Sequence, residues 1–472
     1  AGIAEYLYYD ISRLSKAKKA AWLEQDAEAS LRAFSLHAID TANYSLHPSL
    51  PFDEELYASY WPVSGEAEPN AVFKNHCSGV KLAPSSIFTH LKTPMLKRRS
   101  REIMQRGILA ANEWLGAQGK PPEEVETRAF ARELTEYGDD AAVDALMDAN
   151  IVDYAFRPFL PMKAFLWQEL LRKFASVGGG GTRRRPEIST AYSNEGTVGF
   201  ALSHSPKDQK DVLKQFTSFC WYYPDNDLCR RGNSFIYLNR YPVKRRGGKY
   251  DIVNNINDRI RDELTTLLGV SDNMAATDMV FYTFAVLCSQ VYLDEFEGAL
   301  FITNRTDLRP RIPIVSDAAV FRRLVNLGRQ IANLERRDHN PANLAEYNYD
   351  EIKAQVPPNF RLVWTKAIQP FNEGQETITL TDGRRNIVIQ CPLDAQRINI
   401  AGYEVIKNVW MKFNSYDYTH CPFTPDDMEG LLVLINKLLE YIALVGEIDV
   451  VMHDVIEGRY PLIRPFVDTD TE

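Results

Sequence analysis

The sequence is poor in the patterns that mark metal sites, disulfide networks and membrane spans. Its six cysteines are scattered over 472 residues without CxxC or CxH spacing, which argues against a zinc site and a disulfide framework. No apolar run reaches the roughly 20 residues of a membrane span, and the N-terminal AGIAEYLYYD lacks a signal-peptide pattern. We therefore expect a cytoplasmic protein with reduced thiols and no membrane contact.

Motifs of common catalytic sites are missing as well. GGGGTRRR at 178–185 does not match GxxxxGK[ST], and neither GxSxG nor HExxH occurs. Asp225 and Asp227 could hold the metal of a nuclease, but such a site needs further ligands that the sequence does not single out. Their context, Pro-Asp-Asn-Asp, is also typical of a turn. We predict neither a metal site nor catalytic residues in this chain.

Positive charge is concentrated in one segment of an acidic chain. The net charge is -9, yet residues 183–249 contain thirteen Lys or Arg and six Asp or Glu. Residues 414–472 contain twelve acids and three bases, so the acidity belongs to the C-terminal tail. A second basic cluster, MLKRRSREIMQR at 95–106, is typical of a solvated helix surface.

Hydrophobic periodicity predicts an α+β fold, in which a helical support layer carries inserted β-rich regions and the C-terminus is helical. Residues 1–150 are predicted to be a mainly helical support region. Residues 151–310 are predicted to be β-rich with some helices, because short β-branched and aromatic runs alternate with turn residues. Residues 311–472 are predicted to be a helical spacer with short strands and an acidic helical end.

Local signals give finer expectations within these regions. Ser316 is expected to cap the helix that follows it, and Thr424 with Pro425 is expected to begin the last helix. The run AGYEVIKNVWMKF at 401–413 is predicted to be helical, whereas 186–240 is predicted to be strands and turns.

The basic segment contains the residue types that DNA binding requires. Lys and Arg bind phosphates, while Arg, Asn, Gln and Ser pair with base edges. Arg183, Arg184 and Arg185 follow four glycines, which predicts a mobile arm along the DNA backbone or in a narrow minor groove. Six positions are predicted to project from turns and strand ends: Asn194, Arg230, Arg231, Asn233, Asn239 and Arg240.

A second basic arm is predicted beside Gly247 and Gly248. It consists of Lys244, Arg245, Arg246 and Lys249. Both arms are expected to contact phosphates, and the Arg and Asn residues around the apolar run FIYL at 235–238 are expected to read bases. The turn TDGRRN at 381–386 is the alternative reading surface. A solvated basic hairpin without a ligand remains open as the simpler interpretation.

Five separated motifs resemble the C-terminal region of Type ISP restriction-modification polypeptides and related single-chain adenine methyltransferases. In chain order they are YLYYDI with KAKKAAWL, NHCSGVKL at 75–82, FRPF at 156–159 with FLW, LRPRIPIVSDAAVFRRLVNLGRQIANLE at 308–335, and INIAGYEVIKNVWMKF at 398–413. The resemblance implies a target-recognition region that reads DNA sequence. In that family a nuclease, a helicase and an adenine methyltransferase precede this region.

The departures from the family limit what the resemblance implies. The sequence contains neither the Asn-Pro-Pro-aromatic motif nor the glycine-bearing cofactor strand of adenine methyltransferases. We therefore expect S-adenosylmethionine to bind only in an upstream methyltransferase domain, on the same polypeptide or on a partner chain. The favoured function is sequence-specific recognition of double-stranded DNA within a restriction-modification enzyme. The alternative is a protein-interaction or scaffold module of a phage-defence system.

Overall fold

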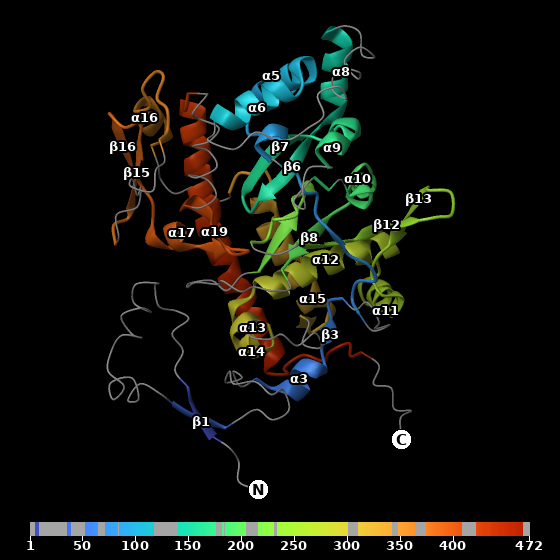
Figure 1. Cartoon of the computed structure of the whole chain (residues 1–472). Helices are drawn as coiled ribbons and strands as arrows, with labels where there is room; N and C mark the ends of the chain where they lie inside the picture. The colour runs from blue at the N-terminus through green and yellow to red at the C-terminus, as the bar shows by residue number, and fades with distance from the viewer. Residues whose placement is uncertain are drawn as a thin grey trace.

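The computed structural model describes residues 5–8, 35–38, 52–64, 71–83, 85–117, 140–175, 182–183, 185–203, 216–230, 234–300, 310–341, 348–363, 374–407 and 422–465. Helices and several small sheets are interleaved along the chain, so the fold is α+β, as the sequence predicts (Figure 1).

Three long helices form the centre of the molecule and pack against one another. These are α12 (Asp272–Cys288), α15 (Ala318–Leu334) and α19 (Pro425–Ile456). The backbones of α12 and α15 approach closely, because a Cβ on Gly328 would stand 2.1 Å from the Phe281 carbonyl oxygen. Shorter helices around this centre are α11 (Asp258–Leu268), α13 (Gln290–Glu295), α14 (Glu297–Leu300), α16 (Tyr349–Ala354) and α17 (Leu393–Arg397).

Two four-stranded sheets pack beside these helices. One has the order β10-β6-β7-β5 and the other β4-β11-β8-β9. All their pairings are antiparallel except β10 with β6. The strands are β4 (Cys77–Ser78), β5 (Thr89–His90), β6 (Ile151–Arg157), β7 (Leu160–Phe165), β8 (Gly199–Leu202), β9 (Thr217–Cys220), β10 (Tyr223–Pro224) and β11 (Phe235–Leu238).

The described parts of residues 52–175 add six helices to the strands already named. They are α3 (Glu54–Ala58), α4 (Ser85–Phe88), α5 (Thr93–Arg106), α6 (Ile108–Ala117), α8 (Asp140–Asn150) and α9 (Gln168–Ala175).

Five two-stranded pairings complete the fold. They are β1 (Glu5–Tyr8) with β2 (Ser35–Ala38), β3 (Trp61–Pro62) with β14 (Arg311–Ile312), β12 (Arg240–Lys244) with β13 (Tyr250–Asn254), β15 (Thr377–Thr381) with β16 (Asn386–Gln390), and β17 (Asn399–Ile400) with β18 (Tyr403–Glu404).

The last helix begins as predicted, whereas the cap of α15 lies one residue later than predicted. Thr424 caps α19 through a capping box with Asp427, and Pro425 is its first residue. At α15 the side chain of Asp317 accepts from two helix amides, while Ser316 instead donates to the Pro461 carbonyl. Asp is as good a cap as Ser, so the sequence alone does not separate the two.

Two predicted elements differ in type. The segment predicted to be strands and turns contains α10 (Pro186–Tyr192), which has Pro at its first position. Of the predicted helix at 401–413, residues 401–404 instead form a turn and β18, where Ala401 and Gly402 both have positive φ (51° and 84°). Residues 405–407 form a π-helical turn, and 408–413 lie outside the described residues. Ala rarely adopts a positive φ, so the hydrophobic spacing of this segment predicted a helix and gave no sign of the turn. Among the described helices, none has the length and apolar character of a membrane span.

Candidate nucleic-acid interface

The β12–β13 hairpin projects from the body of the molecule beside α10 and α11 (Figure 1). The Arg245 amide donates to the Lys249 carbonyl at 2.8 Å, and this bond closes the turn. Gly247 and Gly248 have φ of 96° and 83°, a conformation that favours glycine because it has no Cβ. The predicted second arm is therefore a closed hairpin with paired strands on both sides of the turn.

Cations dominate the charge of this hairpin. Residues 240–254 contain five Lys or Arg and a single acid, Asp251, which forms an ion pair with Arg245. Lys244, Arg246 and Lys249 are exposed and have no carboxylate partner in the part of the chain that the structure describes. Three uncompensated positive charges thus lie at or beside the tip.

The helix α10 joins the first basic triplet to the base of this hairpin. It packs against β12, and Arg185 is its N-cap residue. Burial raises the pKa of the Cys77 thiol to about 12, and Glu187, Arg185 and Tyr241 lie close enough to act on it. Arg185, the last residue of the triplet, therefore lies near the hairpin through α10, although the two are distant in sequence.

Arg183 is held by backbone pairing. Its amide donates to the Lys81 carbonyl at 2.8 Å, and the Lys81 amide donates back at 3.0 Å. The Arg183 side chain is exposed, and it has no ion pair among the described residues. The prediction of a mobile arm thus does not hold at Arg183, whereas Arg184 lies outside the described residues.

The second basic cluster, on α5, has a different electrostatic character. Four of its cations are exposed or half-buried and form ion pairs: Lys97 with Asp148, Arg98 with Glu102, Arg101 with Asp144, and Arg106 with Glu113. Arg99 is the exception, because it is buried and donates to the Thr89 carbonyl at 3.0 Å. The ion pairing agrees with the prediction of a solvated helix surface, and it leaves little positive potential for an anionic partner.

Two predicted base-reading residues have structural roles instead. Asn239 is 1% exposed, and its amide group donates to the Gly196 carbonyl and the Thr277 hydroxyl, each at 2.9 Å. The Val198 amide donates to its side-chain oxygen at 3.1 Å. Arg230 donates to the Gly402 carbonyl at 3.2 Å and braces the β17–β18 turn. We therefore remove both from the set of DNA contacts.

The remaining predicted residues divide into surface positions and undescribed ones. Asn194 is exposed after α10, and its amide donates to the Thr190 carbonyl at 2.7 Å. Arg240 is half-buried at the start of β12. Arg231 and Asn233 lie outside the described residues, so their role in base reading stays a prediction.

A buried ion pair accounts for the Asp-rich turn and for the arginine of FRPF. Arg157 donates to Asp225 at 2.9 Å, with side chains 11% and 6% exposed. The Tyr154 hydroxyl donates to the same carboxylate at 2.6 Å, and so does the Asp227 amide. Burial raises the pKa of Asp225, while Arg157 and Tyr154 oppose this shift. The Asp225 carboxylate thus holds the turn together through three partners.

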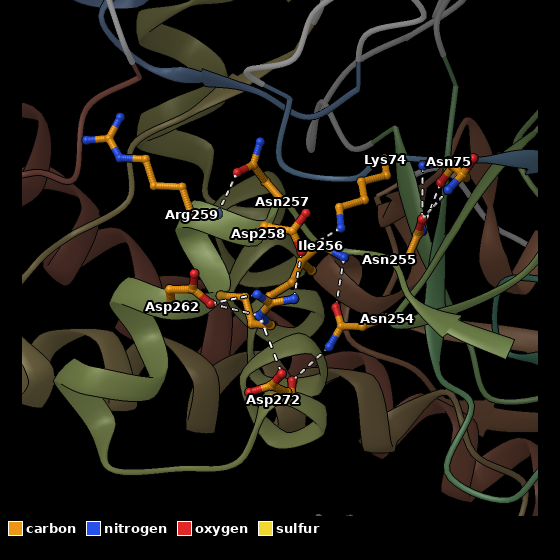
Figure 2. A network of polar contacts seen from close by, with 11 residues as sticks. Lys74, Asn75, Asn254, Asn255, Ile256, Asn257, Asp258, Arg259, Asp262 and Asp272 are labelled. Carbon is orange, nitrogen blue, oxygen red and sulfur yellow. Dashed lines mark hydrogen bonds and ion pairs between the residues drawn. The ribbon is translucent and has the colours of Figure 1, made fainter.

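Sequence reasoning missed the asparagines that anchor the hairpin (Figure 2). Asn255, fully buried just after β13, accepts from the Asn75 amide at 2.9 Å and donates to the Leu238 carbonyl at 2.9 Å. Beside it, the Asn254 side chain donates to the Asp272 carbonyl at 2.9 Å. The available signal was the polar run NNIND that directly follows a strand. These bonds fix the base of the hairpin to α12 and to the 71–83 segment.

One cluster among the described residues has the spacing of metal ligands. It consists of His453, Asp454 and Glu457 near the end of α19. Arg459 forms ion pairs with both carboxylates, at 2.8 Å and 2.5 Å, so their charge is already compensated. The cluster gives no support to a metal site.

The structure is similar to larger proteins solved with DNA. The ATP-dependent Type ISP restriction-modification enzyme LlaBIII bound to DNA has a TM-score of 0.53 and 14% identity, over 89% of this chain and 26% of that one. The DrdV–DNA complex has a TM-score of 0.54 and 18% identity, over 91% of this chain and 42% of that one.

A nuclease-deletion mutant of the Type ISP restriction-modification enzyme LlaGI, in complex with a DNA substrate mimic, has a TM-score of 0.52 and 14% identity. The similarity covers 90% of this chain and 36% of that one, so the chain spans less than half the length of each of the three. No curated protein is significantly similar in sequence. The Type ISP C-terminal specificity domain, by contrast, matches residues 71–419, most of the sequence, and the chain belongs to this family.

Proposed function

We propose that this chain recognises a specific sequence in double-stranded DNA, as the target-recognition part of a restriction-modification enzyme. The observation that carries the proposal is the projecting hairpin, on which Lys244, Arg246 and Lys249 have no carboxylate partner among the described residues. Such cations bind phosphates and release condensed counterions, which is the main source of affinity for DNA. The family and the DNA-bound structures of similar fold support the same function.

The anchoring of the hairpin fits a role in positioning. A loose basic tail binds any duplex, whereas a ribbon held at its base approaches the DNA in one orientation. Asn254 and Asn255 supply that anchor, and Arg183 and Arg185 lie near the same base. The cations of the hairpin therefore set the register in which other side chains meet the bases.

Catalysis belongs to other parts of the enzyme in this proposal. The chain spans less than half the length of the three structural relatives, and its sequence lacks the adenine methyltransferase motifs. S-adenosylmethionine and the flipped adenine would be held by a methyltransferase domain of the same polypeptide or of a partner chain. In this proposal the chain works in the cytoplasm, together with its DNA partner.

The proposal is tested by a triple substitution, Lys244→Gln with Arg246→Gln and Lys249→Gln. Binding to duplexes of any sequence should weaken, because three phosphate contacts are lost. The slope of log affinity against log salt should become shallower by about one for each lost contact. Fluorescence anisotropy at several salt concentrations measures both quantities.

A matched control removes the same charge from α5. In the variant Lys97→Gln with Arg98→Gln and Arg101→Gln, the lost cations are ion-paired, so the salt slope should stay that of the unaltered chain. Equal slopes for the two triple variants would contradict the proposed surface. DNA-independent capture of a partner protein, without salt-dependent DNA binding, would favour the scaffold alternative.

A further inference from the structure

The β12–β13 hairpin exposes apolar side chains between its cations. Val243 and Val253 are 41% and 38% exposed. In the register of the hairpin, Val243 pairs with Asp251 and Tyr241 pairs with Val253. Paired residues share a face and alternate residues return to it, so the two valines are diagonal neighbours on one face.

This valine face has a fixed base and an ion pair toward the turn. At the base, the Tyr241 hydroxyl donates to the His76 carbonyl at 3.2 Å. Toward the turn, Arg245 forms its ion pair with Asp251, and both residues belong to the same face by alternation. The valines therefore lie between an anchored aromatic ring and a pair without net charge.

The distribution of charge indicates which part of a duplex this face meets. The Asp251 carboxylate disfavours close approach of a phosphate, and Arg245 only compensates it. By alternation Lys244 lies on the opposite face, Arg246 lies in the turn, and Lys249, opposite Arg245, lies at the turn end of the valine face. An apolar face bordered by cations suits a DNA groove, where base edges lie between two phosphate backbones.

The width and chemistry of the grooves select one of them. A two-stranded ribbon fits the major groove of B-DNA, about 12 Å wide, without deforming the duplex, whereas the minor groove, about 6 Å wide, would first have to be widened. The major groove also contains the apolar 5-methyl group of thymine. Resting on the proposed function, we infer that the β12–β13 hairpin enters the major groove and that Val243 and Val253 contact a thymine methyl group of the recognised site.

The test begins with the preferred duplex of the full chain, selected from a random library. Each thymine is then replaced singly by uracil, which removes only the methyl group. Affinity should fall about four-fold at one or more positions, the effect of burying one methyl group. In Val243→Ala or Val253→Ala that thymine and its uracil counterpart should be bound with equal affinity. Both residues are exposed, so the variants should fold.

Two exposed valines elsewhere serve as controls. Val450→Ala on α19 and Val388→Ala on β16, at 62% and 55% exposure, should keep the full uracil penalty. Loss of the penalty in Val388→Ala alone would move the reading surface to the β15–β16 hairpin and overturn the inference. A penalty that persists in both hairpin variants, or is absent at every thymine despite strong sequence preference, would also overturn it. A chain with no sequence preference at all would instead overturn the proposed function.

Discussion

Burial separates the asparagines and arginines of this chain into two groups. Asn239 and Asn255 are buried and fully engaged with backbone groups, and Arg157 is paired with Asp225. Arg183 and Arg246, of similar sequence context, face solvent. A buried polar group needs its hydrogen bonds, so the first group contributes stability and the second is free to bind a ligand.

Replacement of Asn239 by Ala should affect folding and not base preference. The Val198 amide, the Gly196 carbonyl and the Thr277 hydroxyl would lose a buried partner. We expect a loss of about 2 to 4 kcal/mol in the free energy of unfolding, measured by urea denaturation. Asn194→Ala, at an exposed position, should change it by under about 0.5 kcal/mol. A shifted base preference without lost stability would show that Asn239 faces DNA.

The buried Glu335 should make stability depend on pH. Its carboxylate accepts from the Ser218 hydroxyl at 2.6 Å and the Phe219 amide at 2.8 Å, yet burial raises its pKa to about 7. Between the usual Glu pKa of about 4.5 and this value, the folded state binds more protons than the unfolded state. Stability from this group therefore falls as pH rises through that window and is constant above it.

Glu335→Gln removes this titration while keeping the shape of the side chain. Relative to the unaltered chain, the variant should gain roughly 2 to 3 kcal/mol between pH 5 and pH 8. Unfolding curves of both proteins at several pH values give the difference in their free energies of unfolding. In this difference the contributions of other titrating groups cancel, except for groups coupled to Glu335. Lys437 is the nearby cation, and burial lowers its own pKa to about 8, so pH 5 to 7.5 is the cleanest range. A difference independent of pH would show that Glu335 is ionised throughout.

At the scale of elements, close packing of α12 and α15 supports the region from which the hairpin projects. α12 contacts β13 and β8, and it also contacts α15 where Gly328 meets Phe281. Asn254 adds a polar link from the end of β13 to the start of α12. The hairpin is thus attached to the helix pair α12 and α15, whose facing side chains are buried against each other.

Gly328→Ala should destabilise the protein although Ala favours helices. The new Cβ would lie 2.1 Å from the Phe281 carbonyl oxygen and 3.1 Å from the Ala285 Cβ, so the two helices must separate. Overpacking of this kind costs about 1 to 3 kcal/mol or more. Gly446→Ala in α19 is the matched control, since nothing lies within 4 Å, and it should gain roughly 0.5 to 1 kcal/mol. Thermal melting of the two variants should therefore shift in opposite directions.

At the scale of the whole molecule, the acidic last helix and the basic hairpin lie apart. The acidic helix α19 crosses the molecule on the side away from the β12–β13 hairpin (Figure 1). Several of its acids are paired, as Asp427 is with Lys92 at 2.9 Å and Glu429 is with Lys353 at 2.5 Å. A net negative protein can therefore present a positive surface to DNA.

The chain as a whole should bind no S-adenosylmethionine. The sequence has neither the glycine-bearing cofactor strand nor the Asn-Pro-Pro-aromatic motif that adenine methyltransferases use. Isothermal titration of the cofactor into the chain should release no binding heat, and added DNA should not change this. Saturable binding at micromolar concentration would mean that a catalytic domain is present.

Elements with strong local signals were predictable from the sequence. The cap of α19 by Thr424, the helix 318–334, the paired strands around FRPF and the Gly247–Gly248 turn all follow from residues that lie close together in the chain. The helix α10 and the turn at Ala401 were not predictable in this way, because tertiary contacts outweigh weak local preferences there.

The candidate site required tertiary information. Local composition identified the basic segment, but it could not tell that Asn239 and Arg230 turn inward or that Arg185 meets the hairpin through α10. Whether a side chain is free depends on which distant segment covers it, and that is a property of the packed chain. The sequence by itself determined the family motifs, the main helices and the location of positive charge, since these depend on neighbouring residues. Only the tertiary structure decided which of the described cations are paired, because many of the acids that neutralise them, such as Asp144 and Asp148 beside α5, come from other elements.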